Sequence, residues 1–166
     1  MAHAREMIDR PEDRGRQQKE RRGARSIGGG GQNITQVFAL VVGVTYLVVG
    51  LVGFAVTGFT GVTSDGADKL LVFDLNVFHN VVHLAIGAGF IAVSRLSDPT
   101  ITQGVVIGAG LVYVLAGLLG FLNQLQILSI DSELAGDNFL HLFSGLAAVL
   151  FGLAGVRQSE AALGTA

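Results

Sequence analysis

Long apolar stretches separated by short polar segments make up the chain after its first 33 residues. Four stretches of 19 residues or more contain no Asp, Glu, Lys or Arg: 34–64, 75–94, 99–130 and 138–156. A helix crosses the hydrocarbon core of a bilayer with about 20 residues, and a chain in lipid must satisfy its backbone hydrogen bonds internally. The pattern therefore predicts four membrane-spanning helices, at about 36–59, 76–94, 103–122 and 138–156.

The second pair of apolar stretches repeats the first. The segment GVTYLVVGLVGF at 43–54 returns as GLVYVLAGLLGF at 110–121, and NVVHLAIG at 80–87 returns as NFLHLFSG at 138–145. A duplicated unit fixes the architecture of a protein, and here each unit is a two-helix hairpin that enters the membrane from the same side. We therefore expect an all-α integral membrane fold of two tandem hairpins, related by a pseudo-twofold axis along the membrane normal.

The basic residues are distributed unevenly between the two sides of this four-helix plan. Eight of the eleven Lys and Arg residues precede residue 34, Arg95 lies between the second and third helices, and Arg157 follows the fourth. Lys69 is on the other side. Since Lys and Arg flanking membrane helices are retained in the cytoplasm, we expect a multi-pass protein of the bacterial cytoplasmic membrane with both termini cytoplasmic.

The distribution of polar residues along the chain also predicts a division into two tails and one transmembrane domain. Residues 1–33 are charged and poor in apolar groups, and we expect them to form a disordered basic cytoplasmic tail. Residues 34–157 form the transmembrane domain, and residues 158–166 a short cytoplasmic tail. The soluble helical-bundle alternative is disfavoured, because the first and third apolar stretches hold too few polar residues for a solvent-facing stripe.

Composition and motifs exclude several classes of function. The chain has no cysteine, so disulfides, thiolate metal sites and a thiol nucleophile are absent. Its net charge of −2 gives no reason to expect a nucleic-acid partner. The sequence contains no nucleophile elbow, no phosphate-binding glycine loop and no paired membrane carboxylates. We therefore expect no catalytic role.

Glycines recur on one face of the first and third predicted helices, together with both tyrosines of the chain. Spacings of three and four place side chains on one helix face, and small residues let helix backbones approach closely in lipid. We interpret the set as two packing seams: Gly43, Tyr46, Gly50, Gly53, Gly110, Tyr113, Gly117 and Gly120. Gly104 and Gly108 add a GxxxG pair, and dimerisation through such a leftover seam stays open.

Polar residues suited to chemistry gather at the start of the second and fourth helices. His79 and His83 are four residues apart, and Asp137 and His141 repeat that spacing. Ionisable groups at membrane depth are costly and mark a functional hypothesis. Three imidazoles and a carboxylate suit zinc or another first-row divalent ion, whereas His83 and His141 alone suit the axial positions of a b-type haem. The favoured interpretation is structural, with helix capping, hydrogen bonds across the bundle and no cofactor.

The segment FDLNVFHNVVHLAIG, residues 73–87, resembles the signature of a bacterial family of small four-helix membrane proteins labelled as a domain of unknown function, number 4383. The similarity covers about residues 36–156. The resemblance implies that His79, Asn80, His83 and Leu84 are the most specific positions here. It implies no established activity and no assigned ligand.

Two functions remain from the sequence. The favoured one is a structural or accessory component of a membrane assembly, with the lipid bilayer and either a homo-oligomer or a larger membrane complex as partners. The alternative is a membrane metal- or haem-binding protein. It would use the histidine cluster formed by His79, His83 and His141 with Asp137, in the half of the bundle that faces away from the cytoplasm.

Overall fold

The computed structural model describes residues 32–60, 62–63, 68–71, 73–130 and 132–164. Four long helices account for most of this part of the chain: α2 (Ile34–Thr57), α3 (Val77–Ser94), α4 (Pro99–Phe121) and α5 (Gly136–Gly164). A two-stranded antiparallel sheet, β1 (Asp68–Leu70) and β2 (Phe73–Leu75), and a short 3-10 helix, η1 (Gln126–Leu128), lie in the connections. Except for its last two residues, the expected tail 1–33 lies outside the described residues.

All four helices are long and apolar enough to cross a membrane. Most of their large apolar side chains point outward, among them Leu51, Leu111 and Leu150, whereas the buried apolar core is a small cluster around Ala39 and Val106. A soluble protein would bury such side chains, but in a bilayer they face hydrocarbon of their own kind. These are the features of a multi-pass membrane protein.

Local capping chemistry sets the helix ends. The side chain of Asn33 caps α2, which ends before Gly58, a glycine with φ of 63°; only glycine adopts that conformation without a steric cost. Helix α4 begins at Pro99, four residues before the predicted start, because the Asp98 side chain caps it and proline suits the first helical turn.

Helix α5 continues to Gly164, beyond its predicted end at 156 and through most of the expected tail 158–166. Residues 158–163 contain no glycine or proline, so nothing in them ends a helix. The extension is also held by its neighbours, since Asn33 Nδ2 and Gln103 Nε2 both donate to Ser159 Oγ, at 3.2 and 2.9 Å. Contacts far apart in sequence thus extend α5, and helix periodicity alone does not reveal them.

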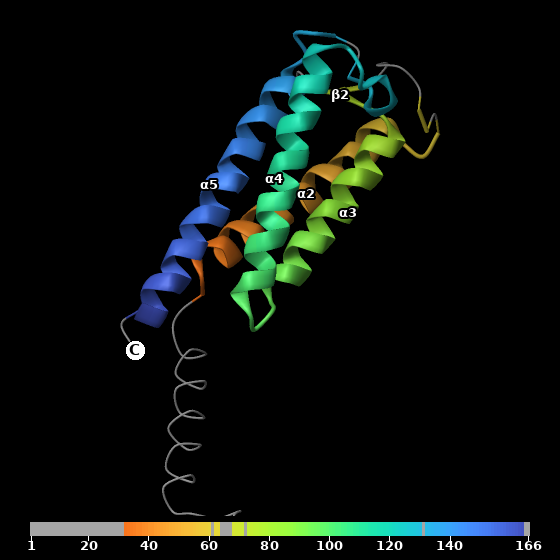
Figure 1. Ribbon diagram of the computed structural model, residues 1–166. Coiled ribbons are helices and arrows are strands. Elements are labelled where there is room, and N and C mark those ends of the chain that lie inside the picture. Colours follow the sequence, from red (N-terminus) through yellow and green to blue (C-terminus); the bar gives the residue numbers. More distant parts are fainter. Residues whose placement is uncertain (1–31, 61, 64–67, 72, 131, 165–166) are drawn as a thin grey trace, which may run out of the picture.

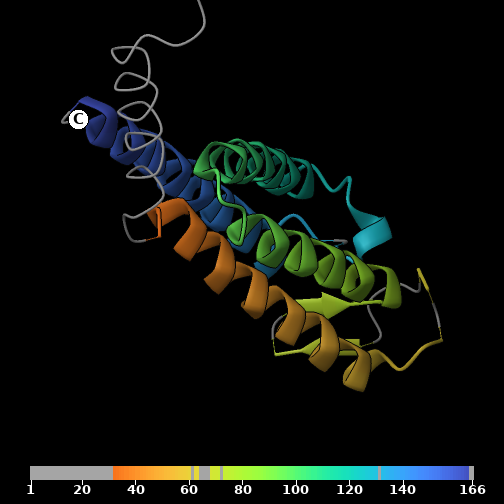
Figure 2. The same ribbon diagram turned by 90° about the horizontal axis from the view of Figure 1, so that it is seen from below.

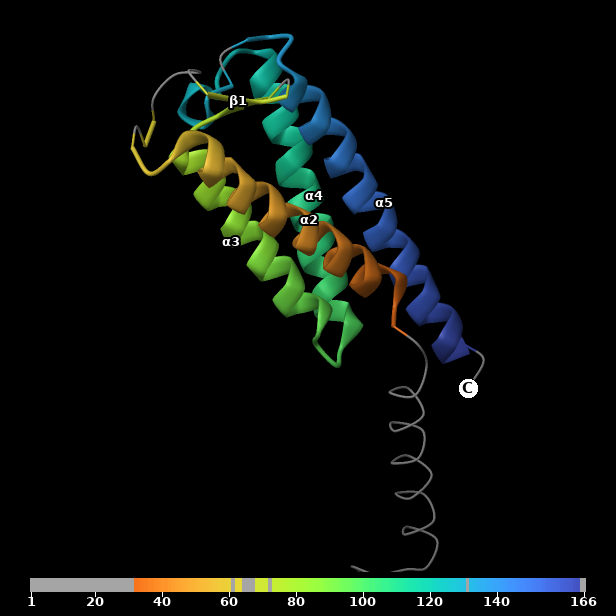
Figure 3. The same ribbon diagram turned by 180° about the vertical axis from the view of Figure 1, so that it is seen from behind.

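The helices pack as two hairpins, with α2 beside α3 and α4 beside α5 (Figures 1 and 2). The connection 95–98 lies at the same end of the bundle as the start of α2 and the end of α5 (Figure 1); we call this the terminal end. The two strands and η1 lie at the opposite end, which we call the loop end (Figure 3). The β-hairpin is a departure from the predicted all-helical pattern, and it lies in the longer of the two loop-end connections.

Close glycine contacts join the helices of each hairpin. A Cβ added to Gly43 of α2 would lie 2.9 Å from the Gly87 carbonyl oxygen of α3. A Cβ added to Gly110 of α4 would lie 2.8 Å from the Gly145 carbonyl oxygen of α5. No side chain fits at these distances, so the backbones touch through glycine. The structure places the seam glycines at the α2–α3 and α4–α5 contacts.

Candidate functional site

The four residues that the sequence singled out for chemistry lie at the loop end of the bundle. His79 and His83 project from α3, and Asp137 and His141 from α5; all four are buried. The Asn76 side chain fixes the first turn of α3 by accepting a hydrogen bond from the His79 backbone at 2.7 Å. Helix capping therefore sets the depth and direction of the first histidine.

Five aromatic rings from all four helices form a closed circuit inside the bundle. The ring centroid of His79 is 4.4 Å from that of His83 and 6.4 Å from that of His141. His83 packs edge-on against Tyr46 at 5.0 Å, and His141 packs edge-on against Tyr113 at 5.2 Å. The two tyrosines complete the circuit at 5.9 Å. We call these five residues the ring cluster, and through it each helix contacts at least one other.

The two tyrosines are the members of the ring cluster that sequence reasoning missed. The repeat had grouped Tyr46 and Tyr113 with the packing glycines, and each does lie on the glycine-bearing face of its helix. Their rings nevertheless reach the interior and contact the histidines. A signal was present, because both tyrosines and two histidines of the chain align in the repeat.

Asn80 and Asn138 lie beside the ring cluster and face the glycine seams. A Cβ on Gly53 would overlap Asn80 Oδ1, and a Cβ on Gly120 would overlap Asn138 Oδ1. The Asn80 amide donates to Thr57 Oγ1 at 2.9 Å, and the Asn138 amide donates to two loop carbonyls at 3.0 and 3.1 Å. The Oδ1 atoms have no hydrogen-bond partner among the described residues, but they face glycine, where weak C–H···O contacts form. Each asparagine therefore holds the loop end of its own hairpin.

Four more buried atoms at this site have no hydrogen-bond partner among the described residues: Nδ1 of His79, His83 and His141, and Oδ2 of Asp137. Buried polar groups are paired in the large majority of cases, and an unpaired one costs about 1–3 kcal/mol. The loop end of the bundle therefore contains buried nitrogen and oxygen atoms to which the described residues offer no hydrogen bond.

The candidate metal ligands are not gathered around one point. Within the described ranges, no group of three or more His, Cys, Asp or Glu side chains is placed to hold a metal ion. The physical reason is visible in the ring cluster, where the imidazoles of His79, His83 and His141 pack against each other and against tyrosines.

The candidate haem ligands do not line the small cavity beside the two tyrosines. His83 and His141 each pack on a tyrosine, and the cavity next to Tyr46 and Tyr113 has a volume of about 30 Å³. Such a cavity holds a water molecule, whereas sites for small organic molecules measure about 300–1,000 Å³.

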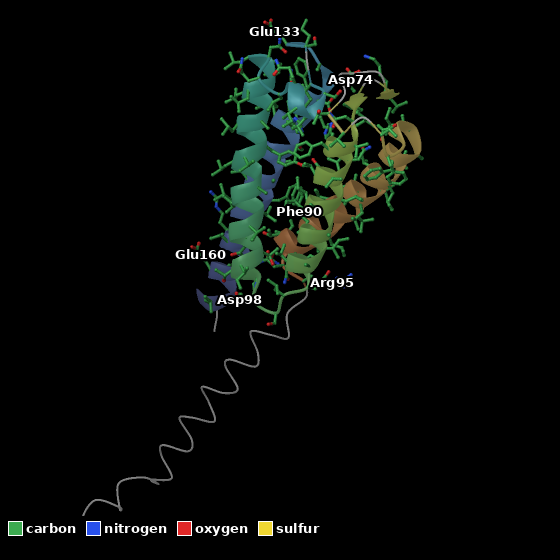
Figure 4. The ribbon with its side chains drawn as sticks, turned by 90° about the vertical axis from the view of Figure 1, so that its right-hand side faces the viewer. Asp74, Phe90, Arg95, Asp98, Glu133 and Glu160 are labelled. Atoms are coloured by element: carbon green, nitrogen blue, oxygen red, sulfur yellow. The ribbon has the colours of Figure 1, made fainter. Side chains whose placement is uncertain are left out.

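Charged side chains of the described bundle lie mainly at its two ends. Figure 4 shows Asp74 and Glu133 at the loop end, and Arg95 and Asp98 at the terminal end. Asp74 forms an ion pair with Lys69 at 2.8 Å. Hydrogen bonds from the backbone and side chain of residue 100 lower the pKa of Asp98 below its ordinary value. Two charged ends and an apolar middle are the distribution that a bilayer imposes.

Residues 36–154 match the model of a protein family described as "Domain of unknown function (DUF4383)". The match covers more than half of the chain. The chain belongs to this family. The match confirms the resemblance carried by residues 73–87. All five residues of the ring cluster of this DUF4383 chain lie inside the matched region. No curated protein and no solved structure matches the chain.

Proposed function

We propose that this DUF4383 protein has no catalytic role and serves as a structural or accessory component of a membrane assembly. The observation that carries the proposal is a set of glycines that face lipid. Apart from chain neighbours and the nearby backbone of the same helix, no described atom lies within 4 Å of a Cβ built on Gly89 of α3, or on Gly104 or Gly108 of α4. Glycine on a lipid-facing helix surface permits close approach of another helix, and the helices of this bundle do not use these three.

The proposal places the two hairpins about a pseudo-twofold axis along the membrane normal. Hydrogen bonds between the hairpins support it. Thr35 Oγ1 of α2 donates to the Phe151 carbonyl of α5 at 3.0 Å, and Thr102 Oγ1 of α4 donates to the Val93 carbonyl of α3 at 2.6 Å. Thr35 and Thr102 belong to a repeated Ile-Thr-Gln triplet. The two threonine bonds therefore occupy equivalent places in the two halves of the repeat. The Gly43–Gly87 and Gly110–Gly145 contacts are equivalent in the same way.

The proposal also places the protein in the bacterial cytoplasmic membrane, with both termini in the cytoplasm. Arg95 and Arg157 support this orientation, because Arg95 directly follows α3, Arg157 lies in the last turns of α5, and basic residues at helix ends are retained inside. The cysteine-free chain makes the test direct. A cysteine at position 69 should react with a membrane-impermeant maleimide on intact cells, and a cysteine at position 95 should react only after lysis. The reverse result would overturn the orientation.

The geometry supports the alternative function, a metal- or haem-binding membrane protein, less well. The imidazole nitrogens without a hydrogen-bond partner among the described residues favour it, but no group of three or more candidate ligands in the described ranges is placed to hold an ion. An absorption spectrum and elemental analysis of protein purified from its own membrane test this directly. A Soret band, or one metal ion per chain, would replace the structural proposal.

Crosslinking in native membranes tests the proposed role. We expect species larger than one chain, and we expect Gly104→Leu with Gly108→Leu to reduce them. The matched control is Val37→Leu with Val41→Leu, which changes the corresponding, lipid-exposed positions of α2. If only single chains were recovered from native membranes, the proposal would fail. Equal effects of the two double variants would show that the glycine face is not the contact.

A further inference from the structure

An apolar groove of about 310 Å³ lies between α3 and α4 on the outer surface of the bundle. Both helices are long and apolar enough to span a membrane, so the groove faces the hydrocarbon of the bilayer. Figure 4 looks onto this side of the molecule, with Phe90 between the two helices. The groove is lined mainly by apolar residues: Gly89, Phe90 and Val93 from α3, and Val105, Ala109 and Val112 from α4.

The repeat explains why this interface is open. In the register that aligns Gly43 with Gly110 and Asn80 with Asn138, the α2–α5 interface is the counterpart of the α4–α3 interface. Two aromatic rings fill the first, where Phe38 and Phe151 stack at 4.7 Å. Val105 and Val93 occupy the corresponding positions of the second, so the groove is open at the place where the other half has an aromatic pair.

The groove lies in one half of the membrane-spanning region. The Thr102 hydroxyl, near the start of α4, donates to the Val93 carbonyl at 2.6 Å, so these two residues lie at the same depth. Helix α4 rises about 15 Å between residues 102 and 112, at 1.5 Å per residue, and one leaflet is half of a hydrocarbon core of roughly 30 Å. The groove therefore extends from near the terminal end to about the middle of the bilayer. An acyl chain ends at that depth, whereas a helix that crosses the membrane continues through both leaflets.

Two side chains of opposite charge lie at the terminal end of the groove. Arg95 is two residues beyond Val93, and Asp98 directly precedes α4; Figure 4 shows both at that end of the two helices. Both are exposed, and among the described residues no ion pair joins one to the other. Arginine binds phosphate oxygens in a fixed geometry, and a carboxylate attracts an ammonium group. One charge of each sign is complementary to a zwitterionic phospholipid headgroup.

We propose that the α3–α4 groove binds an acyl chain of phosphatidylethanolamine from the leaflet at the terminal end, with the phosphate at Arg95 and the ammonium group at Asp98. A chain in the groove contacts two helices at once, and so gains more dispersion contacts than a chain on a convex surface. The lipid thereby joins α3 and α4, which belong to different hairpins. Gly104 and Gly108 are turned about 100° around α4 from Val105 and Ala109, so the lipid leaves them open to the partner helix of the proposed function.

Tryptophan quenching tests the lipid contact, because the chain has no tryptophan of its own. Val112→Trp places a reporter at the inner end of the groove, and Val41→Trp is the control, since Val41 is 59 % exposed on α2 and does not line the groove. The full chain is reconstituted into vesicles of equal parts phosphatidylethanolamine and phosphatidylglycerol, with brominated chains on one lipid or the other. At position 112 we expect brominated phosphatidylethanolamine to be preferred about fivefold, equivalent to about 1 kcal/mol. At position 41 the two lipids should quench equally.

Charge variants test the headgroup contacts in the same vesicles. Arg95→Gln and Asp98→Asn should each reduce the preference at position 112, and asparagine still caps α4. Arg157→Gln is the matched control, because Arg157 lies in α5, which does not line the groove. Equal quenching by both lipids at position 112 would overturn the proposal, since it would show only exchangeable lipid. Quenching at position 41 with none at position 112 would overturn it in favour of a protein segment in the groove. A preference that survived both charge variants would refute the headgroup contacts.

Filling the groove provides a second, independent test. Val93→Phe with Val105→Phe copies the Phe151 and Phe38 pair of the other half, so the bundle should still fold, which far-UV circular dichroism checks. In this background the tryptophan at position 112 should lose its preference for phosphatidylethanolamine. Val81→Phe should keep the preference, since Val81 is 49 % exposed on α3 and does not line the groove. A filled groove that kept the full preference would show that the lipid binds elsewhere, and the proposal would be wrong.

Discussion

Gly53→Ala is the most direct test of how the hairpins pack. The added methyl group would overlap Asn80 Oδ1 and lie 2.6 Å from Asn80 Cγ. The Asn80 side chain has no free space to accept this, because its amide is bonded to Thr57 Oγ1 at 2.9 Å and the residue is fully buried. Either the asparagine rotates and loses that bond, or α2 and α3 separate at the loop end.

The expected cost follows from these two routes. Overpacking a close contact costs about 1–3 kcal/mol, and loss of one buried hydrogen bond costs about 1 kcal/mol. Alanine has a higher helix propensity than glycine by about 1 kcal/mol, which offsets part of the loss. We therefore expect Gly53→Ala to lower the free energy of unfolding by about 1–3 kcal/mol.

Gly104→Ala is the matched control, because no described atom lies within 4 Å of its added Cβ. Both variants can be unfolded by titrating SDS into mixed micelles and followed by far-UV circular dichroism. The control should be as stable as the unmodified chain or slightly more stable. If Gly53→Ala were equally stable, the α2–α3 contact through Gly53 would be wrong.

A double variant identifies the clashing partner. Asn80→Ala removes the side chain that the new methyl group meets, at the cost of its bond to Thr57. In Gly53→Ala with Asn80→Ala, the two losses should therefore be less than additive, by about 1 kcal/mol or more. Strict additivity would mean that Gly53 contacts something other than Asn80.

Three further predictions concern the ring cluster, the terminal end and the loop end. His141→Ala should cost roughly 2 kcal/mol by opening a cavity beside Tyr113, and chelators should leave that cost unchanged; a chelator-dependent loss would instead support a metal. Gln103→Leu should destabilise the chain by about 1–3 kcal/mol and increase proteolysis after residue 155, because its amide donates to the α5 backbone and to Ser159 at 2.9 Å. Lys69→Ala should change stability by less than about 1 kcal/mol, since the Lys69 side chain is 60 % exposed in its ion pair with Asp74; a larger loss in the same SDS titration would contradict this.

The helices and their glycine contacts followed from the sequence because lipid imposes simple rules. A run without charge predicts a span, and glycines spaced by three and four predict a close backbone approach, as at Gly43 and Gly110. The length of α5 did not follow, because contacts with Asn33 and Gln103 stabilise it, and these are distant in sequence. The β-hairpin was also missed, since its strands are only three residues each.

The candidate site followed only in part. The repeat predicted His79, His83, Asp137 and His141 in one half of the bundle, and in the structure all four side chains are buried there. It did not determine side-chain direction, and the contacts of the imidazole rings with one another and with the tyrosines became visible only in the structure. The tyrosines were assigned to the packing seams because helical spacing gives only the face on which a residue lies. It does not show that the rings of Tyr46 and Tyr113 extend to the histidines.

The two halves of the chain are alike at the loop end and differ toward the terminal end. At the loop end, the asparagine–glycine contact is present in both hairpins, through Asn80 with Gly53 and Asn138 with Gly120. Toward the terminal end, an aromatic pair fills one inter-hairpin interface, and a valine pair leaves a groove in the other. The repeat makes these two interfaces counterparts, yet their side chains fill them unequally. Duplication therefore preserved the backbone contacts through glycine more closely than the side-chain packing between the hairpins.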